Sequence, residues 1–185
     1  TGNVASKNIG AELTKSRGHF VQNYMGQHDP AENFVLGAAP KHVECADCHN
    51  AHQSNVTPSP GVPMVSGSLA GVSGIDAAGQ AIKYAQYEQE ICYKCHGDNN
   101  VSSSLSITRQ IAQLNTRLEF DPGNPSFHPV AAIGVNQNVP TLLSPYTTLS
   151  RIASTDCHNN DDVSRPKGPH GSNNAYLVAK NYTTS

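Results

Sequence analysis

The stretch that decides how this chain folds is residues His42–His52, which read HVECADCHNAH. Its centre, Cys45 to His49, has the pattern C-x-x-C-H, in which two thiols separated by two residues are followed at once by histidine. This pattern is the attachment site of c-type haem, because each thiol can add to one vinyl group while the histidine binds the iron. A second complete copy, Cys92-Tyr93-Lys94-Cys95-His96, argues against a chance match. The sequence therefore predicts two covalent haem sites, with attachment through Cys45, Cys48, Cys92 and Cys95 and proximal ligands His49 and His96.

A third, incomplete copy is Ser154-Thr155-Asp156-Cys157-His158, where serine stands in place of the first cysteine. The aspartate before the cysteine and the asparagine after the histidine repeat those of the first copy. We interpret Cys157 and His158 as a third haem site held by a single thioether, since serine cannot form that bond. The alternative is an unrelated cysteine that forms an intermolecular disulfide.

A structural zinc site made from the same four cysteines is the alternative interpretation of the two complete motifs. Zinc ribbons usually separate their cysteine pairs by ~15–20 residues, whereas 43 residues lie between Cys48 and Cys92. The histidine directly after each pair favours haem over zinc.

The composition indicates a chain that is short of apolar side chains for a core. Leu, Ile, Val and Phe make up about 19% of the 185 residues, and tryptophan is absent. The net charge is only −2, so the high charge of a disordered chain is missing as well. Porphyrin rings would supply the missing apolar surface. We therefore expect a single domain over residues 1–185, mostly irregular and loop-rich with a few short α-helices, organised around covalently bound haems.

Regular structure is expected in only a few places. The expected elements are a helix over 11–17, a helix over 80–95 that ends on the second motif, a helix over 104–119 and a strand over 174–182. Ser, Pro and Gly dominate residues 53–79, so no regular element is expected there, and no long element is expected over 131–153.

The charge and hydropathy patterns exclude some partners. The pI is near 6.5 and lysine and arginine form no run, so nothing favours a nucleic acid. No apolar stretch approaches the ~20 residues that span a bilayer. The chain begins at Thr1 with no signal-peptide pattern, which we interpret as a processed, exported protein, because covalent haem attachment is associated with the far side of the cytoplasmic membrane.

Nine histidines suit iron that is bound by two imidazoles. With three of them proximal, six remain for the opposite faces of the three haems. By motif we rank the distal candidates in the order His52, His128, His170, His28 and His19. Pro129 holds His128 on an extended segment, while His42 lies too close to Cys45 to rank with the others. A bis-histidine set predicts low-potential carriers, since methionine ligation raises the potential.

These motifs resemble those of multihaem c-type cytochromes, in particular extracellular electron-transfer cytochromes of metal-reducing bacteria and some archaea. The match is carried by Cys45–His52 as C-x-x-C-H-x-x-H, by Phe127–Val130 as F-H-P-V and by Gly168–Ser172 as G-P-H-G-S. The resemblance implies bis-histidine iron, closely stacked haems, little regular structure and electron transfer. Some members polymerise into filaments in which a distal histidine comes from the next subunit. Ser154 departs from the family pattern.

The expected function is electron transfer along about three bis-histidine c-type haems, with a polymerised filament as one form that the protein can take. The expected partners are other redox proteins or further copies of this chain, outside the cell or at its surface, with the periplasm as the alternative. Filled sixth coordination positions leave no place for a substrate, so we expect an electron carrier and not an enzyme. The alternative function is a multihaem reductase, which would need an open iron with acid/base groups nearby.

Overall fold

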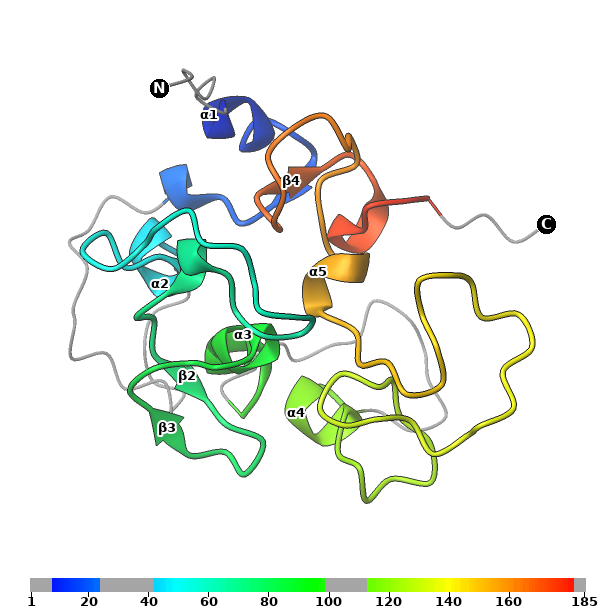
Figure 1. Ribbon diagram of the computed structural model, residues 1–185. Coiled ribbons are helices and arrows are strands. Elements are labelled where there is room, and N and C mark those ends of the chain that lie inside the picture. Colours follow the sequence, from blue (N-terminus) through cyan, green and yellow to red (C-terminus); the bar gives the residue numbers. More distant parts are fainter. Residues whose placement is uncertain (1–7, 24–41, 99–112, 182–185) are drawn as a thin grey trace. The chain divides into compact units, whose positions relative to one another are not determined.

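The computed structural model describes residues 8–23, 42–98 and 113–181 of the chain (Figure 1). The longest helix in these ranges, α3 (Glu88–His96), has nine residues, and the other helices have three or four. The strands pair in two small two-stranded sheets. The prediction of a loop-rich fold with a few short helices is confirmed. No helix in the described ranges is both long and apolar enough to cross a bilayer.

The described residues fall into two compact units. The terminal unit contains those of Thr1–Gln27, His42–Glu44 and Ser154–Ser185, and the central unit contains those of Cys45–Ala153. The first two motifs thus belong to the central unit and the third to the terminal unit. The assignment of residues 1–185 to one domain stays a prediction.

A β-hairpin precedes the second motif in the central unit. β2 (Gly74–Ile75) pairs antiparallel with β3 (Ala81–Ile82), with Gly74 opposite Ile82. Asp76 closes the turn, because its carboxylate accepts from two backbone N–H groups of the turn at 2.8 and 2.9 Å. Gly79 has φ +81°, which favours glycine. The helix predicted over 80–95 is therefore wrong in its first half, because those residues form β3, bends and an isolated β-bridge at Tyr87.

Helix α3 carries the second motif at its C-terminal end, as predicted. It begins where Glu90 Oε2 accepts from the backbone N–H groups of Gln86 and Tyr87 at 2.7 and 3.0 Å. It ends at Gly97, whose N–H donates to the carbonyl of Tyr93 at 3.1 Å. Both ends are thus set by partners for backbone groups that a helix leaves unpaired.

The core of the central unit is small, as the composition led us to expect. Val72, Ala85 and Ile91 are each less than 8% exposed and pack together. Around them lie three partly buried side chains, Cys48, Val65 and Leu69. Cys48 of the first motif therefore borders the same cluster as Ile91, which lies directly before the second motif.

The helix predicted over 104–119 is found only in its last part. α4 (Thr116–Glu119) begins after Asn115, whose side chain accepts from two N–H groups of its first turn. Residues 113–115 are not helical, so the prediction is wrong there, and residues 104–112 lie outside the described ranges. Residues 131–153 form no helix or strand, as expected.

The structure also differs from expectation at residues 53–79 and at the N-terminal helix. Residues 53–79, expected to hold no regular element, contain β2 and the 3₁₀ turn η2 (Gly67–Leu69). The helix expected over 11–17 is instead α1 (Ile9–Glu12), which is capped by Asn8 and followed by a bend.

In the terminal unit, a short sheet pairs a segment near the N-terminus with a segment near the C-terminus. β1 (Arg17–Gly18) pairs antiparallel with β4 (Gly171–Ser172), with Gly18 opposite Gly171. A Cβ atom on Gly18 would lie 2.5 Å from the carbonyl oxygen of His170, and one on Gly171 would collide with the carbonyl of Glu12. Only glycine fits at both positions, so the G-P-H-G-S segment lies against the N-terminal residues.

The strand expected over 174–182 is wrong. Residues Ala175–Leu177 form a 3₁₀ turn, η3, and Tyr176 and Leu177 have φ values of 59° and 58°. Such left-handed residues cannot continue a strand. The turn directs the carbonyl of Tyr176 to the ring of His158, with which it forms a 3.0 Å hydrogen bond.

Candidate haem-attachment sites

The first motif forms one turn of helix that presents His49 at its end. In α2 (Cys45–Cys48) the backbone N–H of His49 donates to the carbonyl of Cys45 at 2.8 Å. The ring atom Nδ1 of His49 lies 2.9 Å from the carbonyl oxygen of Ser68. Since a carbonyl only accepts, Nδ1 carries the proton, and in the neutral ring Nε2 is then the nitrogen with the lone pair. This is the form of histidine that binds a metal through Nε2.

The third motif has the same local structure, although serine replaces its first cysteine. α5 (Ser154–Cys157) is again one turn, and the N–H of His158 donates to the carbonyl of Ser154 at 2.8 Å. The Nδ1 atom of His158 donates to the carbonyl of Tyr176 at 3.0 Å. His158 is exposed.

An asparagine follows the histidine in both of these motifs and fastens each to its surroundings. Asn50 donates to the carbonyl of Gly71 at 3.0 Å, and its side-chain oxygen accepts from the N–H of His52 at 3.0 Å. The side chain of Asn50 therefore fixes the backbone between His49 and His52.

Asn159 has the matching role in the terminal unit. Its side chain donates to the carbonyl of Thr155 at 2.9 Å and accepts from the N–H of Gly168 at 2.7 Å. A Cβ atom on Gly168 would lie 2.9 Å from the ring of His170. The residue after His158 thus fastens the segment that carries His170, and the two parts of the predicted proximal and distal pair lie in one unit.

The second motif is supported at its end by α4. Thr116 Oγ1 donates to the backbone carbonyl of His96 at 2.7 Å. Arg117 makes two parallel bonds of 2.7 Å to the carboxylate of Asp98, which lies two residues after His96. The bonds from Arg117 hold the pKa of Asp98 below its usual range. His96 is exposed at the end of a rigid helix.

The two complete motifs meet in the central unit. Lys94 Nζ donates to the main-chain carbonyl of Asp47, and both residues are buried. Each lies between the two cysteines of its own motif. Burial raises the pKa of the neighbouring Cys48 thiol to about 11, an effect that the charge of Lys94 partly offsets. Cys48 is therefore a protonated thiol at neutral pH.

None of the five cysteines, all of which lie in the described ranges, forms a disulfide bond. Cys45, Cys95 and Cys157 are exposed and the other two are half-buried, so none is enclosed away from a group arriving at the surface. Burial and the charge of Asp156 raise the pKa of Cys157. An open hollow of about 440 Å³ lies at the first motif and is lined by His49, Ala51, Ser54, Asn55, Val56 and Ser68. Thiols outside any disulfide, imidazoles that donate from Nδ1 and an open surface fit a covalently bound haem.

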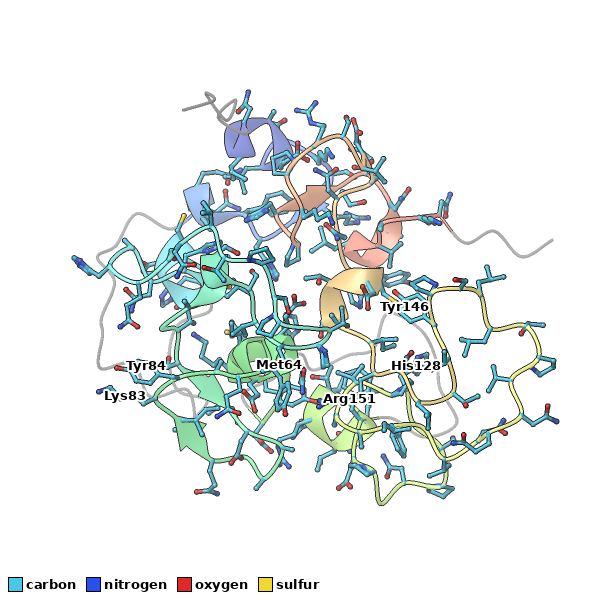
Figure 2. The ribbon with its side chains drawn as sticks, in the orientation of Figure 1. Met64, Lys83, Tyr84, His128, Tyr146 and Arg151 are labelled. Atoms are coloured by element: carbon cyan, nitrogen blue, oxygen red, sulfur yellow. The ribbon has the colours of Figure 1, made fainter. Side chains whose placement is uncertain are left out.

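The distal candidates of the central unit are both exposed side chains on fastened backbone. His52 follows Asn50 as described above. The segment after His128 is held where Ile152 donates to the carbonyl of Pro129 at 2.9 Å and Arg151 donates twice to that of Val130, at 2.8 and 3.1 Å. The guanidinium of Arg151 also stacks on the ring of Tyr87, 4.4 Å from its centre. Figure 2 shows His128 and Arg151 at the two ends of the long loop drawn in yellow in Figure 1.

The remaining candidates belong to the terminal unit or lie outside the described ranges. His19 directly follows β1, at a strand end as expected. Continuing the register of β1 and β4 by one step places His19 opposite His170. His42 is nearly buried, with Nε2 3.5 Å from Glu44. His28 lies outside the described residues.

No family model, curated protein or solved structure matches this chain. The site is therefore argued from its own residues. Within the described ranges, which include all five cysteines, no three side chains of His, Cys, Asp or Glu converge where they could hold a metal ion. Zinc and haem are separated by the experiment given below.

Sequence reasoning missed the residues that fasten the motifs. Lys94 and Arg151 contact backbone carbonyls that lie 47 and 21 positions away, which no local pattern reveals. The sequence does show that Asn50 and Asn159 occupy the same position in two motifs, and this repetition is the one local signal of their role.

Proposed function

We propose that this chain is an electron carrier that holds three c-type haems, two through complete motifs and one through Cys157 alone. The observation that supports this most directly is the matched presentation of His49 and His158. Each follows a one-turn helix, and each donates from Nδ1 to a backbone carbonyl. A zinc ribbon or an unrelated cysteine at position 157 gives no reason for the same arrangement to occur twice.

When bound, haem supplies an iron that takes up and releases one electron. The residues of this chain attach, orient and ligate it. Nδ1 bonds fix the tautomer of the proximal imidazoles, as second-shell bonds do for metal-bound histidine in general. The distal ligands that we propose are the exposed His52 and His128 in the central unit, and the partly buried His170 and His19 in the terminal unit. Two imidazoles on each iron leave no position for a substrate, which favours a carrier over a reductase.

We further propose that the protein works outside the cytoplasm, at the cell surface or beyond it, and exchanges electrons with other redox proteins or with copies of itself. A filament is one such assembly. These proposals rest on the motifs and on the exposure of the candidate ligands.

The test is to produce the full chain in a host that attaches c-type haem and to measure its absorption spectrum and mass. We expect a red protein with a low-spin spectrum, a mass increase of three haems and no binding of carbon monoxide after reduction. A variant with Cys45→Ala and Cys48→Ala should carry two haems.

Other outcomes are equally informative. A colourless preparation that contains zinc would refute the haem proposal. Two haems with Cys157 alkylatable would refute attachment at the third motif. Carbon monoxide binding to one iron would show an open coordination position and favour the reductase.

A further inference from the structure

One hydrogen bond joins the two complete motifs. Lys94 is 3% exposed and Asp47 is 5% exposed, and Lys94 Nζ donates to the main-chain carbonyl of Asp47. Lys94 is the residue before Cys95, and Asp47 is the residue before Cys48. The bond therefore runs between corresponding positions of the two attachment sequences.

A buried ammonium group at this position is costly unless it is well bonded. The hydrophobic core lies close by, because Ile91 of the same helix belongs to it and Cys48, the residue after Asp47, packs against it. An apolar side chain at position 94 would suit that core without the cost of burying a charge. What lysine adds is reach and a donor, with which α3 holds the backbone of α2.

We propose that Lys94 is the positioning residue that sets the separation and orientation of the two haems attached to the central unit. This inference rests on the proposed function. Each haem is fastened by thioethers and a histidine to its own helix, so the relation between the helices becomes the relation between the haems. Electron exchange falls steeply with separation, and a fixed bond between the helices keeps that separation constant. The positive charge also favours the reduced form of both haems.

The test compares Lys94→Met with Lys83→Met in the haem-loaded full chain. Lys83 is exposed and its ammonium lies 5.1 Å from the ring centre of Tyr84 (Figure 2), so its loss matches the change in side chain without touching either motif. The readouts are haem content by mass, the paired Soret bands in circular dichroism that neighbouring haems produce, and a redox titration. We expect Lys94→Met to keep its haems, to weaken or alter the Soret pair and to lower the potentials. Lys83→Met should match the wild type.

A second readout needs no haem. In chain produced without haem attachment, we expect Lys94→Met to speed hydrogen exchange in peptides that cover α2 about tenfold or more, because losing a bond to a charged group loosens α2 from α3. Lys83→Met should leave that rate unchanged. If Lys94→Met does not fold, Lys94→Gln, which stays polar but is too short to reach the carbonyl of Asp47 and carries no charge, has to show the same changes.

The outcomes separate the two proposals. Haem-loaded Lys94 variants with the wild-type Soret pair and potentials would overturn the positioning role and leave electron transfer standing. A wild-type chain that takes up no haem would overturn the proposed function itself.

Discussion

Replacing Glu12 with glutamine should loosen the terminal unit by an amount that its contacts allow us to estimate. Glu12 is fully buried, and its carboxylate accepts from Lys15, Arg165 and Asn160, each at 2.6 Å. Glutamine keeps the shape but removes the charge and turns one acceptor into a donor. A bond to a charged group contributes ~1.5–3 kcal/mol.

The cost should be smaller than the sum of the lost bonds. Lys15 keeps its 2.5 Å bond to Asp161, and the side chain of Arg165 is 39% exposed, so water can replace its lost partner. We therefore expect Glu12→Gln to lower the free energy of opening this unit by about 2–3 kcal/mol.

The pH dependence gives the sign of the effect. Burial raises the pKa of Glu12, but the bonds from Lys15 and Arg165 outweigh it and leave the pKa below its ordinary value. The carboxylate therefore stabilises the folded state fully above the unfolded pKa of ~4.3, and this contribution is lost as the pH falls through the folded pKa. The pKa of Asp161 is also lowered, against the effect of burial, by its bond from Lys15. The variant should thus lose the part of the acid sensitivity that Glu12 supplies and keep the parts from Asp161 and from Asp162, whose pKa the bonds from Ser164 lower.

The assay is hydrogen–deuterium exchange of the haem-loaded chain, read on peptides that cover residues 9–19 and 159–172. At pH 7 we expect protection in Glu12→Gln to fall by ~30-fold or more, since 1.4 kcal/mol corresponds to a factor of ten. The difference from wild type should shrink as the pH falls below 4. Glu119→Gln, in α4 of the central unit, is the control and should leave these peptides unchanged. A fall of less than threefold at neutral pH, or an equal fall at both pH values, would refute the reasoning.

Three further predictions concern the fastening of the sites. Ser154→Cys should shift the α absorption band of the third haem to shorter wavelength without changing the number of haems, because its remaining vinyl group becomes saturated; an unmoved band contradicts single-thioether attachment. Arg151→Met should increase hydrogen exchange around His128 by ~30-fold, for a loss of about 2 kcal/mol in two bonds and one ring contact, whereas unchanged exchange would show that Arg151 does not hold this segment. Tyr176→Gly should stabilise the terminal unit by about 1 kcal/mol in thermal unfolding, since glycine adopts a positive φ without strain. Tyr176→Val should instead weaken the Nδ1 bond of His158 and speed exchange of that ring proton in NMR spectra, and equal behaviour of the two variants would contradict the assigned strain.

The sequence predicts best where the chemistry lies in consecutive residues. The end of α3 on the second motif and the position of His19 at a strand end follow from local signals. The start of α3 does not, because the residues before it are good helix formers whose N–H groups find other partners. Ala85 donates to the carbonyl of Val72 at 2.7 Å, a contact between separate segments that propensity does not contain.

Gly79 illustrates the same limit in a single residue. A glycine before a run of helix formers is as typical of a hairpin turn as it is of a helix boundary. What decides is Asp76, whose carboxylate closes the turn three residues earlier. The left-handed conformation of Tyr176 and Leu177 is harder to predict, since neither residue type favours a positive φ. The structure pairs this conformation with a hydrogen bond from the ring of His158 to the carbonyl of Tyr176.

The two units differ in how their residues could hold a haem. The unit with fewer cysteines for attachment has more histidines for each motif. Among the described residues of the central unit, two complete motifs are matched by four histidines, His49, His52, His96 and His128, enough for two imidazoles on each of two irons. The terminal unit has a single thiol in a motif, Cys157. His158 is accompanied there by His19 and His170, which lie directly beside the paired strands β1 and β4, and Asn159 and the buried charges around Glu12 fasten the same segments. A haem with one thioether depends more on its ligands and on the backbone that carries them. The terminal unit, whose motif lacks one cysteine, thus has more than the two histidines that one iron requires. Its buried ionic network also stabilises the segments that carry these histidines.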